Sequence, residues 1–172
     1  MDGTFKAVPR LFSQLYTLHS RYMGQVFPFL FCLLTSRKKE NYCRLHRLIK
    51  EKATENGLDF NPTEIIIDFE RATIADIHEI LPNTVVRGCF FHYAQCVWRK
   101  VQELGLSTLY REDKGVKTWI RRAAAMPLIP IDNIEDVFLL MQETAPEVQN
   151  KTAFHDYMVD TWIDETGAIF TP

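Results

Sequence analysis

A chain of 172 residues, 47% of them hydrophobic and 12% aromatic, has room for one folded domain with a sizeable core, which excludes a disordered protein. Its 20 basic and 22 acidic side chains give a net charge of −2, so any binding of nucleic acid must come from local basic patches. Four cysteines are too few for a disulfide scaffold, and the longest apolar run, 26–34, is far shorter than the roughly 20 residues of a membrane-spanning helix. We therefore expect an intracellular protein without a membrane span.

The first third of the chain is predicted to form three strands, at residues 4–8, 15–18 and 25–34. These segments are rich in Phe, Tyr, Val and Leu, and short connections separate them. Strands joined in this way form an antiparallel meander. The third segment is apolar almost throughout, so we expect both of its faces to be covered.

Helices and strands then alternate. Residues 39–55 place Tyr42, Leu45 and Ile49 at helical spacing, which predicts an amphipathic helix. The elements expected after it are a strand at 64–68, a helix at 71–81, a strand at 84–87 and a helix from 92 to about 104. The remainder is predicted to be helical, at 117–126, 133–143 and 152–163.

This order predicts an α/β fold with a mixed five-stranded sheet, in which three antiparallel strands are followed by strands that alternate with helices. A ribonuclease H-like core has this order of elements. We expect residues 1–106 to form that core and residues 107–172 to form a helical insertion region.

Two aspartates mark the ends of predicted strands. Asp2 lies at the start of the first strand and Asp68 at the end of the fourth. If these strands are neighbours, the carboxylates meet at one end of the sheet and offer the oxygen ligands that Mg²⁺ prefers. Taken singly, each has a simpler interpretation, because Asp2 precedes Gly3 in a turn-like pair and Asp68 precedes a helix that it could cap.

Cys89 and His92 form a Cys-x-x-His pair at the junction between a strand and a helix. Two ligands do not make a zinc site, and no second pair at finger spacing follows, so we expect no structural zinc. The simpler alternative is a buried cysteine next to a hydrogen-bonded core histidine.

Basic side chains cluster in three places, at residues 37–39, 99–100 and 121–122. A cluster of this kind most often forms the solvated face of a helix. If the protein binds DNA, the candidate contacts are Arg99, Lys100, Arg121 and Arg122.

Three ordered sequence blocks resemble the MULE (Mutator-like element) transposase domain. They are residues 1–6 (MDGTFK), residues 67–72 (IDFERA) and residues 88–92 (GCFFH), the last continued by Gln95, Trp98 and Lys100. Residues 27–28, 42–48 and 160–162 are also similar to that family, so the resemblance covers essentially the whole chain.

The resemblance implies a DDE-type transposase, which cuts and joins DNA by metal-assisted attack on phosphodiesters. By position, Asp2 matches the first catalytic acid and metal ligand, and Asp68 the second. Cys89 and His92 match the block that supports the active site. The implied cofactor is Mg²⁺ or Mn²⁺, the implied partner is transposon-end DNA, and the expected location is nuclear or intracellular; oligomerisation is left open.

The chain departs from the family pattern at the third acid, which belongs to an Asn-Asn-x-x-Glu-like block that is not recognisable in residues 1–172. Asp164 and Glu165 are the last acids, but their neighbours do not match. Whether the chain is an enzyme therefore stays open. The alternatives are a domesticated or decayed relative that associates with DNA without cutting it, and a ribonuclease H-like nuclease unrelated to transposition.

Overall fold

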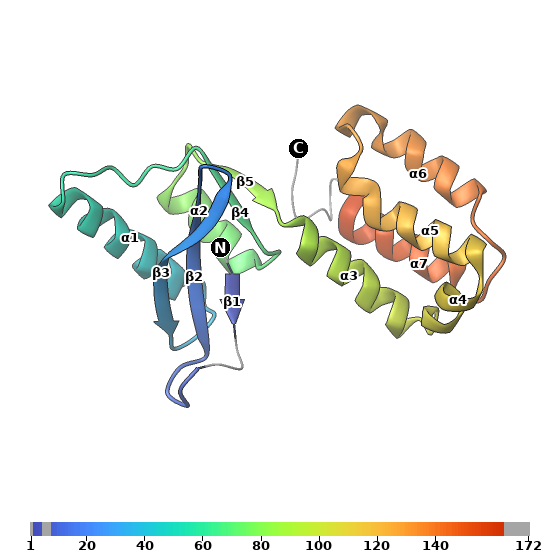
Figure 1. Ribbon diagram of the computed structural model, residues 1–172, viewed down its shortest axis with the longest axis horizontal. Helices are drawn as coiled ribbons and strands as arrows, with labels where there is room; N and C mark the ends of the chain where they lie inside the picture. The colour runs from blue at the N-terminus through green and yellow to red at the C-terminus, as the bar shows by residue number, and fades with distance from the viewer. Residues whose placement is uncertain (1, 5–7, 164–172) are drawn as a thin grey trace. The chain divides into compact units, whose positions relative to one another are not determined.

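The computed structural model describes the backbone of residues 2–4 and 8–163 and the side chains of residues 8–163. The chain divides into two compact units, Met1–Cys89 and Phe90–Pro172. Figure 1 shows strands and helices in the first unit and only helices in the second.

The strands of the first unit pair as two sheets. In one, β1 (Asp2–Thr4), β2 (Gln14–Tyr22) and β3 (Gln25–Leu34) form an antiparallel meander in the order β1-β2-β3. In the other, β4 (Glu64–Ile67) and β5 (Val85–Gly88) are parallel. The connection between β4 and β5 contains a helix, as a parallel pair requires.

A two-residue turn joins β2 to β3. Met23 and Gly24 have φ angles of 48° and 77°, and positive φ at both central residues matches the twist of the flanking strands. The second strand therefore continues to Tyr22, beyond the predicted end at residue 18. Ser20 and Arg21, interpreted from the sequence as part of a connection, lie inside the hairpin.

Two helices complete the first unit, α1 (Lys39–Glu55) and α2 (Arg71–Ile80). They pack against each other, and the buried face of α1 covers one face of the antiparallel sheet. The core residues shared by these elements are Tyr16 and Leu18 of β2, Leu34 of β3, and Tyr42 and Leu45 of α1. Both helices begin at the predicted residue, and α1 also ends there.

The prediction that both faces of β3 are covered is wrong. Leu30, Cys32 and Leu34 face the core, but Phe29 and Phe31 on the other face are 52% and 63% exposed. Side chains alternate along a strand, and the elements packed on this sheet in the described part of the chain cover a single face. A run of apolar residues allows both faces of a strand to be buried. It does not show that a second layer of helices or strands covers the other face.

The second unit is a bundle of helices. Its elements are α3 (Phe90–Glu103), α4 (Ser107–Glu112), α5 (Lys114–Ala125), η1 (Met126–Leu128), η2 (Ile131–Asn133), α6 (Ile134–Glu143), α7 (Lys151–Met158) and the π-helical turn η3 (Val159–Ile163). Its core is built from residues of α3, α5, α6 and α7, among them Val97, Val101, Trp119, Phe138 and Phe154.

The fold is α/β, with an antiparallel meander followed by strands that alternate with helices and then by helices alone, as predicted. A single five-stranded sheet is not formed by the strand pairs of the described residues, so that detail stays a prediction. The functional boundary near residue 106 also stays a prediction. Within the described ranges, no helix is both long enough and apolar enough to cross a membrane.

Candidate active site around Asp68

Asp68 directly follows β4, one of the two strands of the parallel pair. Ile65 and Ile67 of this strand are buried and hold it in the core, and the half-buried Asp68 comes immediately after them. Its Oδ1 accepts a hydrogen bond from the backbone N–H of Glu70 at 3.3 Å. The carboxylate is therefore attached to a rigid strand, and its own turn helps to orient it.

Side chains from two other elements hold the turn that carries Asp68. Tyr42 of α1 donates a hydrogen bond from its hydroxyl to Glu70 Oε2 at 2.8 Å. Arg37 Nε donates to Glu70 Oε1 at 3.2 Å, and Gln14 Nε2 of β2 donates to the Tyr42 hydroxyl at 2.5 Å. Through Glu70, the turn after β4 is tied to both β2 and α1.

The local electrostatic environment is negative. Burial is the first cause that raises the pKa of Tyr16, and the charges of Tyr42, Asp68, Asp76 and Glu70 raise it further. These carboxylates thus act on one buried hydroxyl.

The hydroxyl of Tyr42 acts as a donor at neutral pH. Burial, as the largest cause, raises its pKa to about 12, and the hydrogen bond to Glu70 raises it as well. The phenol is therefore protonated under ordinary conditions. From the sequence, Tyr42 was predicted only as part of the apolar face of a helix. The helical pattern does not show that the hydroxyl at the end of this side chain contacts a carboxylate.

A buried histidine of α1 and a buried aspartate of α2 join these two helices. His46 Nδ1 and Asp76 Oδ2 lie 2.5 Å apart, and both side chains are fully buried. The pKa of the neighbouring Cys43 thiol is raised, first by its burial and then by Asp76. The pair was not predicted, although His46 lies four residues after Tyr42 and therefore on the same buried helix face.

The placement of Asp2 is described for its backbone alone. Asp2 pairs with Thr17 in the ladder between β1 and β2. The proximity of its carboxylate to that of Asp68 stays a prediction, and Asp164 and Glu165 lie outside the described residues.

Cys89 follows β5 and is placed beside the end of β4. Its backbone N–H donates to Ile67 O at 2.9 Å, one residue before Asp68. His92 lies in the first turn of α3, in the second unit, where its half-buried ring contacts that of Phe91 edge to face. The support of the acidic site by Cys89 and His92 stays a prediction. In the part of the chain that is described, no three His, Cys, Asp or Glu side chains gather as a metal-binding group.

The four basic residues predicted to contact DNA differ in their surroundings. Arg99 and Arg121 are exposed. Lys100 pairs with Glu103 at 2.7 Å and lies over the ring of Tyr157, and Arg122 donates to the Thr144 hydroxyl at 3.1 Å. Arg122 is exposed as well, so Lys100 is the one of these four residues that is half-buried and paired with an acid.

Comparison with known proteins gives one match. Residues 1–96 match the family model of the MULE transposase domain, and these residues include all of the first unit, Asp68, Cys89 and His92. No curated protein and no solved structure matches the chain.

Proposed function

The chain belongs to the MULE transposase domain family, and from that premise we propose that it serves DNA transposition through metal-dependent cleavage and joining of phosphodiester bonds. The observation that carries the proposal is Asp68, a half-buried carboxylate fixed at the end of a buried strand within the matched residues. The tethered turn around it has the rigidity that a catalytic group needs.

The two sheets are proposed to belong to one ribonuclease H-like sheet. β1 is an edge of the antiparallel sheet, and among the described residues β4 pairs only with β5. Joining β1 to β4 would give the order β3-β2-β1-β4-β5 and would satisfy two exposed strand edges. In that order Asp2 and Asp68 lie on neighbouring strands.

Asp2 and Asp68 are proposed to hold Mg²⁺ or Mn²⁺. Carboxylate oxygens are suitable ligands for such an ion, and Asp68 is half-buried at the end of a strand. When bound, the metal would activate an attacking oxygen and stabilise the leaving one. Glu70 is held by Tyr42 and Arg37, so its role is to position the turn. Cys89 and His92 are proposed to support this end of the sheet.

DNA is the proposed substrate, and the exposed Arg99, Arg121 and Arg122 are the proposed contacts with its phosphates. Lys100, which pairs with Glu103, would add a further positive charge. A second candidate function is a DNA-associated relative that does not cut. The family match alone does not distinguish the two functions, and the cleavage test below separates them.

Metal binding is the first test. We expect the chain to bind Mn²⁺, followed by electron paramagnetic resonance, and Asp68→Asn to weaken that binding by about 10-fold or more because a charged ligand is lost. The matched control is Asp59→Asn, which removes an equal charge from an exposed loop position. Equal affinities of the wild type and Asp68→Asn would refute the metal site.

Cleavage is the second test, and it separates the two candidate functions. Labelled terminal-repeat DNA is incubated with Mn²⁺ and either the wild-type chain or Asp68→Asn. Cleavage by the wild type that is lost in Asp68→Asn supports the transposase. Metal and DNA binding by the wild type without cleavage supports the DNA-associated relative.

A further inference from the structure

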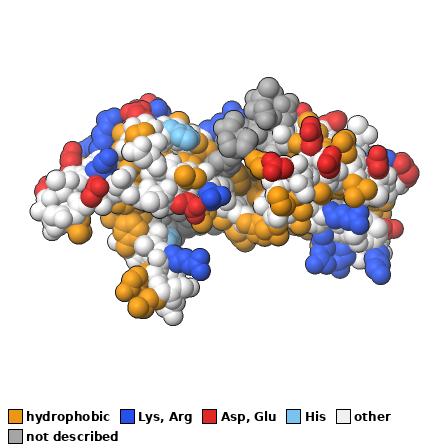
Figure 2. Space-filling view, turned by 90° about the horizontal axis from the view of Figure 1, so that it is seen from above, with side chains coloured by type: hydrophobic (Ala, Val, Ile, Leu, Met, Phe, Trp, Pro, Cys, Tyr) orange, Lys and Arg blue, Asp and Glu red, His pale blue; other side chains and the backbone are white. Residues whose placement is uncertain are grey.

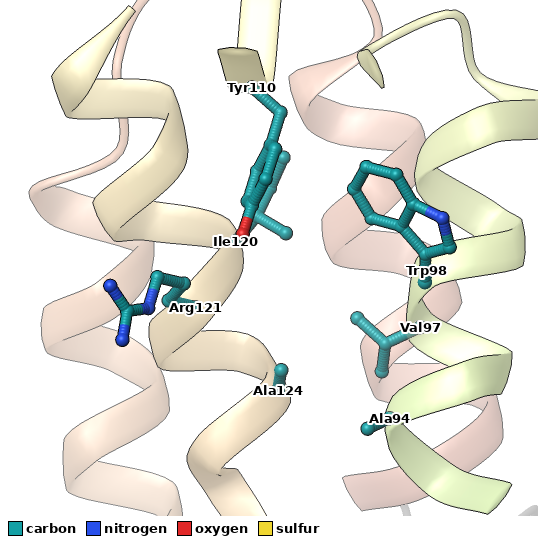
Figure 3. A pocket seen from close by; sticks show the side chains of 7 residues that line it. All are labelled: Ala94, Val97, Trp98, Tyr110, Ile120, Arg121 and Ala124. Atoms are coloured by element: carbon teal, nitrogen blue, oxygen red, sulfur yellow. The ribbon is translucent and has the colours of Figure 1, made fainter.

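A small apolar pocket lies within the second unit, between α3, α4 and α5. It has a volume of about 180 Å³, and its walls are Ala94, Val97 and Trp98 of α3, Tyr110 of α4, and Ile120, Arg121 and Ala124 of α5. Figure 3 shows these side chains on facing helices. Typical sites for drug-sized ligands occupy about 300–1,000 Å³, so this pocket suits a smaller group.

Two aromatic rings form one end of the pocket. Trp98 and Tyr110 lie with their centroids 5.0 Å apart and their planes at 67°, and both residues are half-buried. Ala94 and Ala124 are small, so the wall next to the rings stays open. Half-exposed aromatic rings beside small residues provide a stacking surface for a planar group.

A stripe of cations runs along α5, one of the three helices that line the pocket. Lys114, Lys117 and Arg121 recur at spacings of three and four residues on α5, so they share one side of it. Lys117 Nζ lies 5.9 Å from the centre of the Tyr110 ring. The Arg121 stem lines the pocket, while in Figure 3 its guanidinium points away from Trp98.

The cations of this stripe are available to an anion. All three residues are exposed, and among the residues that the structure describes none of them has a carboxylate within 4.0 Å. On the face that Figure 2 shows, Lys and Arg side chains gather along one side of the helical unit and acidic side chains along the other. The surface next to the pocket is therefore positive although the whole chain is slightly negative.

We propose that this pocket, which we call the base seat, holds an unpaired base of a DNA strand, while Lys114, Lys117 and Arg121 bind the adjacent phosphates. An apolar, aromatic pocket flanked by a row of cations matches a nucleotide, whose ring is apolar on its faces and whose backbone is anionic. An apolar peptide side chain would fill the pocket but would leave the cations without a partner. The proposal rests on DNA as the substrate in the proposed function, and it is independent of the metal at Asp68.

The experiment measures binding of fluorescein-labelled oligonucleotides to the full chain without a divalent metal. The probes are a single-stranded dT oligonucleotide, an abasic strand of equal length with the same phosphates, and a duplex. We expect the dT strand to bind about 10-fold more tightly than the abasic strand, because stacking of a base is lost in the latter. Equal binding of the dT and abasic strands by the wild type overturns the proposal whatever the variants do.

Variants then assign the two parts of the site. Trp98→Leu keeps an apolar side chain and should remove the preference for the dT strand over the abasic strand. Tyr110→Leu is the second variant, in case Trp98→Leu does not fold. Lys117→Gln with Arg121→Gln should weaken both strands alike and reduce the salt dependence of binding. Lys52→Gln with Arg44→Gln in the first unit is the charge-matched control, since it also removes two exposed positive charges. A dT preference that survives both aromatic variants overturns the base seat.

Two further outcomes separate this inference from the proposed function. Asp68→Asn should retain the dT preference in full, because it lies in the other unit. If Mn²⁺ binding or cleavage fails while the preference persists, the metal chemistry is refuted and the base seat stands. If the duplex binds as tightly as the dT strand, binding is by phosphates alone and the base seat is refuted while the proposed function stands.

Discussion

Individual side chains in the first unit act on the turn that carries Asp68 through a chain of hydrogen bonds. The hydroxyl of Tyr42 receives a hydrogen bond from Gln14 and donates one to Glu70, whose backbone N–H in turn binds Asp68. One buried hydroxyl therefore links β2, α1 and the turn after β4. Loss of a shared buried group leaves more than one partner without a hydrogen bond.

Replacing Tyr42 by Phe removes this hydroxyl and keeps the ring. We expect the free energy of unfolding to fall by about 1–3 kcal/mol, because Gln14 and Glu70 each lose a partner in a buried region. Urea unfolding followed by circular dichroism measures the change. Tyr22→Phe is the control, since Tyr22 is 66% exposed. A loss for Tyr42→Phe no larger than that for the control would contradict the linking role.

A buried histidine of the second unit predicts a dependence on pH. His155 Nε2 lies 3.2 Å from Trp119 Nε1, which donates to it, and burial is the first cause that lowers the pKa of His155. The unfolded chain takes up a proton near pH 6.5, while the folded chain does so only at lower pH. Stability from this residue is thus fully present above pH 6.5 and is lost as pH falls toward the folded pKa.

His155→Gln tests this dependence while it retains a hydrogen-bond acceptor for Trp119. The midpoint of urea unfolding, followed by tryptophan fluorescence, is compared at pH 7.5 and pH 5.5. We expect the wild type to lose more stability than the variant between these two values. All other side chains are the same in both proteins, so their contributions cancel in the comparison. Identical losses would show that His155 does not contribute.

At the scale of elements, the hydrophobic periodicity was sufficient to predict α1 and α2, and it was insufficient to predict what covers a strand. Tyr42, Leu45 and Ile49 recur at helical spacing whatever the helix packs against. The exposure of Phe31 depends instead on whether a second layer exists, and a single strand carries no information about that layer. The β2–β3 turn was missed because Met23 is not a residue that ordinarily signals positive φ.

The candidate site around Asp68 could be predicted only in part, because a local sequence pattern marks Asp68 but not its distant partners. Asp68 ends a β-branched run, and this local pattern marks it as a carboxylate at the end of a strand. The partners that orient its turn, Gln14, Tyr42 and Arg37, lie far from it in the sequence. Such contacts depend on the packing of β2 and α1, so no local pattern could have revealed them.

The buried pair between α1 and α2 provides a test at this scale. Asp76→Ala should lower the free energy of unfolding by about 2–5 kcal/mol, because it leaves His46 buried without its partner. The double variant with Leu at both positions should cost less than the sum of the two single Leu variants, since it leaves no unpaired polar group. Additive losses would show that the two side chains do not interact.

At the scale of the whole molecule, each unit has a core of its own. In the first unit, Leu18 and Leu34 of the sheet pack with Leu45 of α1. The second unit buries Val97 and Phe154 among its helices. A segment with its own core is in principle able to fold by itself, so the two units are expected to unfold as separate cooperative transitions.

The distribution of tryptophan makes this last expectation measurable. All three tryptophans, at positions 98, 119 and 162, belong to the second unit, so their fluorescence reports that unit alone. Asp76→Ala lies in the first unit and should therefore shift part of the circular dichroism transition in urea while the fluorescence midpoint stays unchanged. His155→Gln should do the reverse and move the fluorescence midpoint. If Asp76→Ala moves the fluorescence midpoint as far as it moves the circular dichroism, the units unfold as one cooperative block. In that case changes near Asp68 would also alter the stability of the helices that carry the proposed base seat.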